Sequence, residues 1–173
     1  MPGGAMENAY RPEAWHELYL MLGGSAAALA GLLFVAMSIH LDDVLKVPFL
    51  RTFARNNTIA MIVLVVRAAA ILMPQNHLML AVELILLDAF GFVMASTVLV
   101  HSRHMPRGRK FRAAATVLSG VLGVAGAISL VAETGGGMYV ITAAYLLLFC
   151  IIMSSAWALM TGVYQADRRS KRR

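Results

Sequence analysis

The chain has 173 residues, of which 60% are hydrophobic and 14% are charged, with a mean hydropathy of +0.72 and a net charge of +6. A soluble domain is closer to half apolar and a quarter charged, so a water-soluble fold of this length could not bury so much apolar surface. The single cysteine, Cys150, excludes an intramolecular disulfide and a cysteine-rich metal site. The composition is that of a membrane protein with one domain.

Residues 1–17 are predicted to form an external segment. Their charged side chains are mostly acidic: Glu7, Glu13 and Glu17 against Arg11. A cleavable signal peptide has a basic region before a short apolar core, so none is expected here. The apolar stretch 18–41 that follows is long enough to cross a bilayer, which takes about 20 residues. We therefore expect a retained first transmembrane helix.

Four further apolar stretches are predicted to span the membrane, namely residues 57–73, 78–100, 113–132 and 138–164. The turn at 74–77 contains proline and asparagine, and the connector at 133–137 contains three glycines, both typical of short loops. The predicted fold is an all-α membrane protein, a bundle of five transmembrane helices over residues 18–164, followed by a basic tail at 165–173.

The segment 42–56 between the first two spans has an amphipathic pattern. Its apolar side contains Val47, Leu50 and Phe53, and its basic side contains Arg51 and Arg55. Pro48 within it can begin a helix but is not tolerated inside one. We predict a short amphipathic segment on the membrane surface, with an ordinary solvated loop as the alternative.

The distribution of basic residues predicts the orientation of the chain. Three lie in the first connector, five in the third connector and five in the tail, all on one side of the membrane if there are five spans. The opposite side carries the acidic amino-terminal segment, an uncharged turn and a loop with Glu133. Cytoplasmic loops hold the excess of lysine and arginine, so we predict an outside N-terminus and a cytoplasmic C-terminus in the cell inner membrane.

The same basic clusters indicate a lipid partner rather than a nucleic acid. They stand beside helix ends, where each lysine or arginine gains about 1 kcal/mol from anionic headgroups. DNA binding requires a recognition element as well, and the sequence shows none. The predicted partner is the bilayer, with anionic headgroups at the cytoplasmic face.

Small residues recur at a spacing of four within the predicted helices. The first span contains Gly23, Ala27 and Gly31, and the fourth contains Ser119, Gly123 and Ala127. Small side chains at this spacing let two helix backbones approach closely. One interpretation is packing within the bundle. The other is that the first helix forms the seam of an oligomer.

Three charged residues, Arg67, Glu83 and Asp88, lie within predicted spans, where each costs at least about 2.5 kcal/mol. Arg67 and Glu83 are at nearly equal distances from the turn at 74–77, so their depths match on antiparallel helices. We predict an intramembrane ion pair between them. Asp88 is left over, either as a neutral carboxyl bonded to a neighbour or as part of a polar pathway for protons or cations.

Motifs for catalysis are missing from the sequence, which has no nucleophile elbow, P-loop, dinucleotide fingerprint or HExxH. His40, His101 and His104 gather at the predicted cytoplasmic side, and the last two would share one helical face. Without a fourth convincing ligand they are weak candidates for a metal site. We therefore expect neither an enzyme nor a cofactor.

The run Trp15-His16-Glu17-Leu18-Tyr19, with the stretch from Gly23 to Ile39, resembles small uncharacterised bacterial integral membrane proteins that are common in actinobacteria. Some of these carry the label of modulator of a membrane-anchored AAA protease. The resemblance is limited to the first helix and the residues just before it. It implies a membrane partner and no catalysis, and it supplies no functional residues.

Two functions follow from these patterns. The first is a non-enzymatic integral membrane protein that acts through helix–helix contacts, as a homo-oligomer or as an accessory or regulatory subunit of a membrane complex. The second is a small channel or transporter for protons or cations that uses Asp88, Glu83 and Arg67. We prefer the first, because small-residue faces, short loops and the missing catalytic motifs all favour it.

Overall fold

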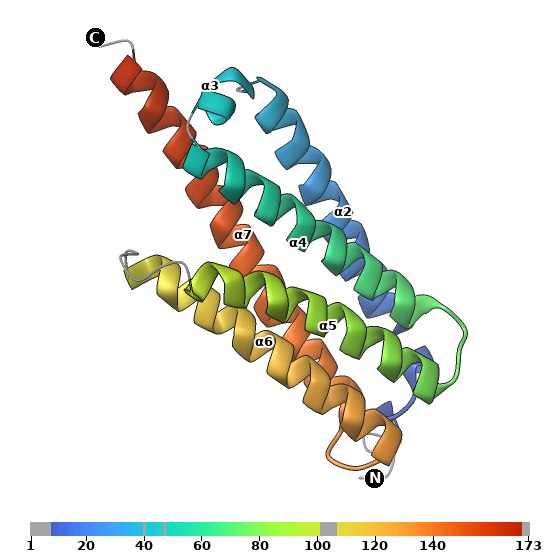
Figure 1. The fold of residues 1–173 in the computed structure, drawn as a ribbon. Coiled ribbons are helices and arrows are strands. Elements are labelled where there is room, and N and C mark those ends of the chain that lie inside the picture. Colours follow the sequence, from blue (N-terminus) through green and yellow to red (C-terminus); the bar gives the residue numbers. More distant parts are fainter. Residues whose placement is uncertain (1–7, 40, 47, 101–106, 171–173) are drawn as a thin grey trace.

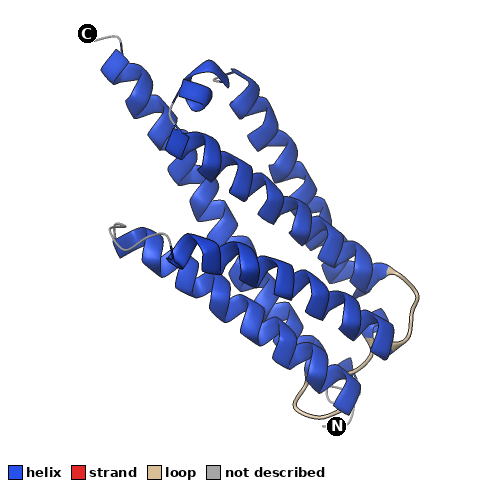
Figure 2. Ribbon diagram, viewed as in Figure 1, coloured by secondary structure: helices blue, strands red, loops and turns tan. Residues whose placement is uncertain are grey.

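The computed structural model describes residues 8–39, 41–46, 48–100 and 107–170. These residues form a short 3-10 helix, η1 (Pro12–Trp15), and six α-helices, without a strand (Figure 1). The α-helices are α2 (His16–Ile39), α3 (Leu41–Lys46), α4 (Pro48–Leu72), α5 (His77–Val100), α6 (Arg107–Ala132) and α7 (Gly137–Ser170). The all-α class predicted from the sequence is thereby confirmed, as Figure 2 shows.

Four stretches of the described chain are long and apolar enough to cross a membrane: Pro12–Ile39, Leu50–Leu72, Lys110–Ala132 and Gly137–Thr161. In addition, α5 has 24 residues, as many as α2, and carries Glu83 and Asp88 among apolar side chains. Helices of this length match the thickness of a bilayer. The chain has the make-up of a multi-pass membrane protein.

Three helices extend beyond the predicted spans. α4 begins at Pro48 rather than near residue 57, α6 begins at Arg107 rather than near residue 113, and α7 runs to Ser170 rather than ending near residue 164. Proline suits the first turn of a helix, where its missing N–H is not needed, and Leu50 just after it is buried. Residues 48–56, predicted as a surface element, are therefore the first turns of α4, and α3 alone forms a separate short helix.

The long helices form two groups that are joined by α7. α2 packs along α4, α5 packs along α6, and α7 packs along α6 and also contacts α4. Figure 1 shows α4 and α5 close together near their connecting turn and farther apart at their other ends. We call the end of the bundle with residues 8–15 and the turns at 73–76 and 133–136 the turn end. The opposite end, with α3 and the starts of α4 and α6, is the basic end.

The buried face of α4 has a heptad-like spacing. Most of its buried side chains recur alternately every four and every three residues, at Leu50, Ala54, Asn57, Met61, Leu64, Ala68 and Ile71. This spacing keeps one stripe of a helix against its neighbours, which here are mainly α2 and α7. Arg67 lies beside this stripe, and from there its side chain reaches α5.

Local signals determine the two connections at the turn end. Asn76 Oδ1 accepts a hydrogen bond from the backbone N–H of Met79 at 2.8 Å, which caps the start of α5. Between α6 and α7, Glu133, Gly135 and Gly136 have positive φ angles of 51°, 78° and 78°. Glycine adopts this region without steric cost, which accounts for the glycines in so tight a connection. Both turns make the consecutive helices antiparallel neighbours.

Candidate functional site: a buried polar core

Six polar side chains are buried where the five long helices meet. They are Tyr19 from α2, Arg67 from α4, Asp88 from α5, Ser119 from α6, and Thr142 and Tyr145 from α7. Each of the six is at most 6% exposed. We refer to these residues as the polar core. Because every long helix contributes a member, the polar core lies where the two helix groups are joined.

An ion pair between Arg67 and Asp88 links the two helix groups. Arg67 Nη1 lies 2.5 Å from Asp88 Oδ1, and the two residues are 1% and 5% exposed. Arg67 belongs to α4, which packs with α2, whereas Asp88 belongs to α5, which packs with α6. Charged side chains within membrane spans commonly pair with one another in the bundle interior. This pair therefore neutralises both charges and connects the groups.

The structure corrects the predicted ion pair between Arg67 and Glu83. Glu83 is only half-buried, and its Oε2 accepts a hydrogen bond from Gln75 Nε2 at 2.9 Å. Asp88, in contrast, shares the buried face of α5 with Leu84, one turn away. Arg67 and Glu83 match in depth, but the helical phase of α5 turns Glu83 to the side and presents Asp88 to α4.

Gly123 on α6 makes room for the Asp88 carboxylate. A β-carbon added to Gly123 would overlap Asp88 Oδ2 and would lie 2.8 Å from Asp88 Cγ and 3.0 Å from Arg67 Nη2. Gly123 is itself buried, so these atoms have no free space beside them. The carboxylate thus occupies a notch in α6 that only a residue without a side chain provides. At this point α4, α5 and α6 meet.

Part of the hydrogen-bonding capacity of the pair is not used. Arg67 Nε, Arg67 Nη2 and Asp88 Oδ2 are buried and have no hydrogen-bond partner among the described residues. The attraction within a buried ion pair offsets its desolvation cost only when the remaining donors and acceptors are also satisfied. On this ground the pair contributes more to the specific pairing of helices than to net stability.

Two tyrosines bring α2 and α7 into the polar core. The Tyr145 hydroxyl donates a hydrogen bond to the backbone oxygen of Leu64 on α4 at 3.1 Å. The Tyr19 hydroxyl and Thr142 Oγ1 share a hydrogen bond of 2.9 Å. The two tyrosine rings pack edge to face, with their centroids 5.6 Å apart. Buried hydroxyls require such partners, so these bonds fix how α2, α4 and α7 fit together.

The small residues predicted for the fourth span lie on the buried face of α6. Ser119 donates a hydrogen bond to the backbone oxygen of Ala144 on α7 at 2.8 Å. Ala127 is fully buried, and Gly123 faces the ion pair. This face of α6 therefore packs within the chain.

On α2 the predicted stripe divides into a packed part and an open part. A β-carbon at Gly23 would lie 2.8 Å from Cβ of Ala68, so this glycine permits close packing against α4. Ala27 and Gly31 are exposed instead. A β-carbon at Gly24 or Gly31 would meet no atom within 4 Å. The expectation that Gly23, Ala27 and Gly31 act as one face is thus corrected.

The weak metal candidates His40, His101 and His104 lie outside the described residues. Within the part of the chain that the structure describes, no group of three or more His, Cys, Asp or Glu side chains is placed to hold a metal ion.

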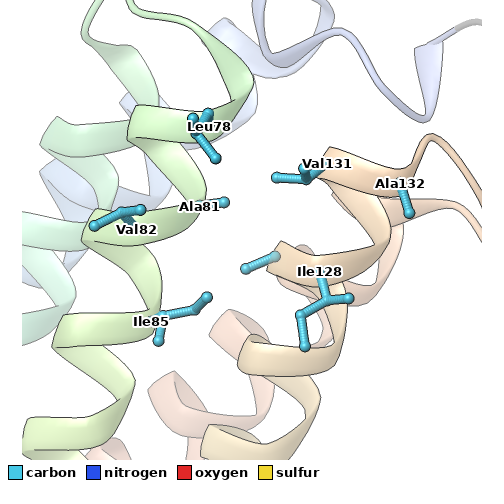
Figure 3. A pocket seen from close by; sticks show the side chains of 8 residues that line it. Leu78, Ala81, Val82, Ile85, Ile128, Val131 and Ala132 are labelled. Carbon is cyan, nitrogen blue, oxygen red and sulfur yellow. The ribbon is translucent and has the colours of Figure 1, made fainter.

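An apolar groove opens between α5 and α6 near the turn end (Figure 3). Its lining consists of Leu78, Ala81, Val82, Ile85, Ala127, Ile128, Val131 and Ala132, so it offers no side chain for acid–base chemistry.

Sequence reasoning misses Tyr19, Thr142 and Tyr145 as members of the polar core. A tyrosine near the end of an apolar run is typical of an anchor at the membrane surface, which hides its role in the interior. The one available signal is the spacing of Thr142 and Tyr145, which places both on the same face of α7. Their burial becomes evident only when the neighbouring helices are in place.

The polar core holds helices together and contains no nucleophile with an adjacent base. Arg67 and Asp88 are paired with each other, and the hydroxyl groups are bonded to a second hydroxyl or to backbone oxygens. Comparison of the chain with protein-family models, with curated proteins and with solved structures finds no match in any of the three.

Proposed function

We propose that the chain is a non-enzymatic integral membrane protein of five transmembrane helices, which acts through contacts of its helices with a second copy or with another membrane protein. In this proposal α5 crosses the membrane as well as the four apolar stretches. The pairing of Asp88 with Arg67 lowers the cost of placing its carboxylate in hydrocarbon. The turn end lies on the outer side of a bacterial inner membrane and the basic end lies on its cytoplasmic side, because lysine and arginine collect on the cytoplasmic side.

The basic end supports this orientation. Lys46, Arg51, Arg55, Lys110 and Arg112 lie on α3 and on the first turns of α4 and α6. Anionic lipid headgroups are suitable partners for such a collection of cations. The Arg112 guanidinium also lies over the ring of Phe53, 5.6 Å from its centroid, and forms a cation–π contact between α6 and α4.

The open face of α2 carries the proposal. In the most apolar part of Pro12–Ile39 only 17% of the residues are buried. In the corresponding parts of Leu50–Leu72 and Gly137–Thr161 the buried share is 39%. Glycine inside a helix costs about 0.5–1 kcal/mol relative to alanine, and no described residue requires it at Gly24 or Gly31. Small residues on an open helix face permit the backbone of another helix to approach closely. The resemblance of this region to bacterial membrane proteins with a membrane partner agrees with that role.

Self-association in a bilayer tests the proposal. In liposomes, energy transfer between donor- and acceptor-labelled copies is expected to fall as the protein is diluted in lipid. The variant that combines Gly24→Ile and Gly31→Ile is expected to associate at least tenfold more weakly than the wild type. The matched control is Gly91→Ile on α5, where a β-carbon also meets open space. Wild-type protein that stays monomeric and purifies alone in mild detergent would contradict the proposal, as would equal association of all variants.

A pathway for protons or cations has less support. It would require a carboxyl that exchanges protons with water, whereas Asp88 is buried and paired with Arg67. Proton uptake by liposomes that is present with the wild-type protein and lost with Asp88→Asn would favour this alternative.

A further inference from the structure

The residues before α2 cross the turn end of the bundle and attach to the start of α7. We call residues 8–15 the strap. The backbone oxygen of Ala9 accepts a hydrogen bond from the N–H of Met138 at 2.9 Å. The Tyr10 hydroxyl oxygen accepts one from the N–H of Gly136 at 3.0 Å. Figure 1 shows this segment beside the connection between α6 and α7.

Trp15 secures the strap where it joins α2. Its Nε1–H donates a hydrogen bond to the backbone oxygen of Asn8 at 2.8 Å. Its ring also meets Tyr139 edge to face, with the centroids 4.7 Å apart. Ala9 is 3% exposed, so the strap is pressed onto the bundle rather than lying free beside it. The strap thus joins the starts of α2 and α7, which make few direct contacts with each other.

The strap lies one helical turn from the polar core on both helices that it joins. Met138, which binds the strap, precedes Thr142 by one turn of α7, and Trp15 precedes Tyr19 by one turn at the start of α2. Residues four apart lie on the same helical face. The Tyr19–Thr142 hydrogen bond is therefore the first part of the polar core beneath the strap, and both residues are buried.

The strap contacts can release without disrupting a helix. The N–H groups of Gly136 and Met138 belong to the start of α7, where a helix has no internal acceptors for its first N–H groups. Water can take over these donors when the strap leaves. The strap is also attached through Pro12, which is buried, and through Tyr10 and Trp15, which pack against the apolar core. A short segment outside the long helices still opens at a lower free energy than the helices beneath it.

We propose that the strap is a closure for the polar core: when bound it shields the Tyr19–Thr142 pair, and when released it admits water toward the Arg67–Asp88 ion pair. The closure itself depends only on contacts within the chain. Its location on the outer side of the membrane rests on the proposed orientation.

Thiol accessibility tests this closure in the full-length chain. Thr142→Cys is made with Cys150→Ala and treated with a membrane-impermeant maleimide in mild detergent. Loosening the strap with Tyr10→Phe and Trp15→Leu is expected to raise the reaction rate at position 142 at least tenfold. Glu13→Gln, an exposed change within the strap, is the matched control and is expected to leave the rate unchanged.

A second cysteine separates opening from unfolding. Ser155→Cys lies deeper in α7 and is buried, so it is expected to stay unreactive in all strap variants. If Ser155→Cys reacts when Tyr10→Phe and Trp15→Leu are combined, the rates at position 142 are compared again with Tyr10→Phe alone. This single change removes the hydroxyl and keeps the aromatic ring in place. Equal rates at position 142 with and without the strap contacts would overturn the closure. In intact cells, labelling from the cytoplasmic side alone would reject the orientation and leave the closure standing.

Discussion

Gly123→Ala is expected to destabilise the bundle strongly, although it adds only one methyl group. The new β-carbon would overlap the Asp88 carboxylate and press on the Arg67 guanidinium, and both are confined by their own pairing. Overpacking of a close-packed interior costs about 1–3 kcal/mol. Displacement of the ion pair adds to this cost, because the separated charges stay buried.

Gly120→Ala is the matched control for this prediction. It lies one turn away on α6, and its β-carbon would meet Asp88 only at the backbone oxygen, at an ordinary 3.9 Å. Unfolding in mixed micelles with increasing denaturing detergent is expected to begin much earlier for Gly123→Ala, while Gly120→Ala behaves as the wild type. Equal stability of the two variants would show that Asp88 does not occupy the Gly123 notch.

Removal of one member of the ion pair is expected to cost more than removal of both. Arg67→Gln leaves the Asp88 carboxylate without its cation, and Asp88→Asn leaves the Arg67 guanidinium without its anion. Breaking a buried pair in this way lowers the free energy of unfolding by about 3–5 kcal/mol. The double variant places two neutral amides opposite each other, so its loss is expected to be smaller than either single loss.

A double-mutant cycle measures this coupling. The free energies of unfolding of the wild type, the two single variants and the double variant are compared under the same conditions. Glu83→Gln is the control, because its side chain keeps an oxygen for the bond from Gln75. Additive losses, or a larger loss with Glu83→Gln than with Asp88→Asn, would reject the Arg67–Asp88 link.

The helical architecture is predictable from sequence because hydrocarbon leaves the backbone little choice. A chain that crosses a membrane must satisfy its own N–H and C=O groups, so a long apolar run predicts a helix. The start of α4 is harder to predict, since Arg51 and Arg55 lower the hydropathy of residues 48–56. Those side chains are exposed while Leu50 and Ala54, which precede them directly, are buried, and this pattern emerges only against α2 and α7.

The polar core is harder to predict than the fold for a geometric reason. Arg67 and Asp88 stand out in sequence because they are charged residues in apolar runs. Their pairing does not stand out, because the rise per residue predicts only how deep each side chain lies along its helix. The choice between Glu83 and Asp88 depends instead on the rotation of α5 about its axis. That rotation is set by packing against α4 and α6. The notch at Gly123 likewise exists only where three helices meet.

Photo-crosslinking along α2 in native membranes tests the proposed contact most directly. A photoreactive side chain at Gly24 or Gly31, on the open face, is expected to form adducts with a second copy or with one discrete membrane protein. The same side chain at Leu22 or Leu33, which are buried, is expected to form none of these adducts. Adducts with lipid alone at positions 24 and 31 would contradict the proposed role of α2.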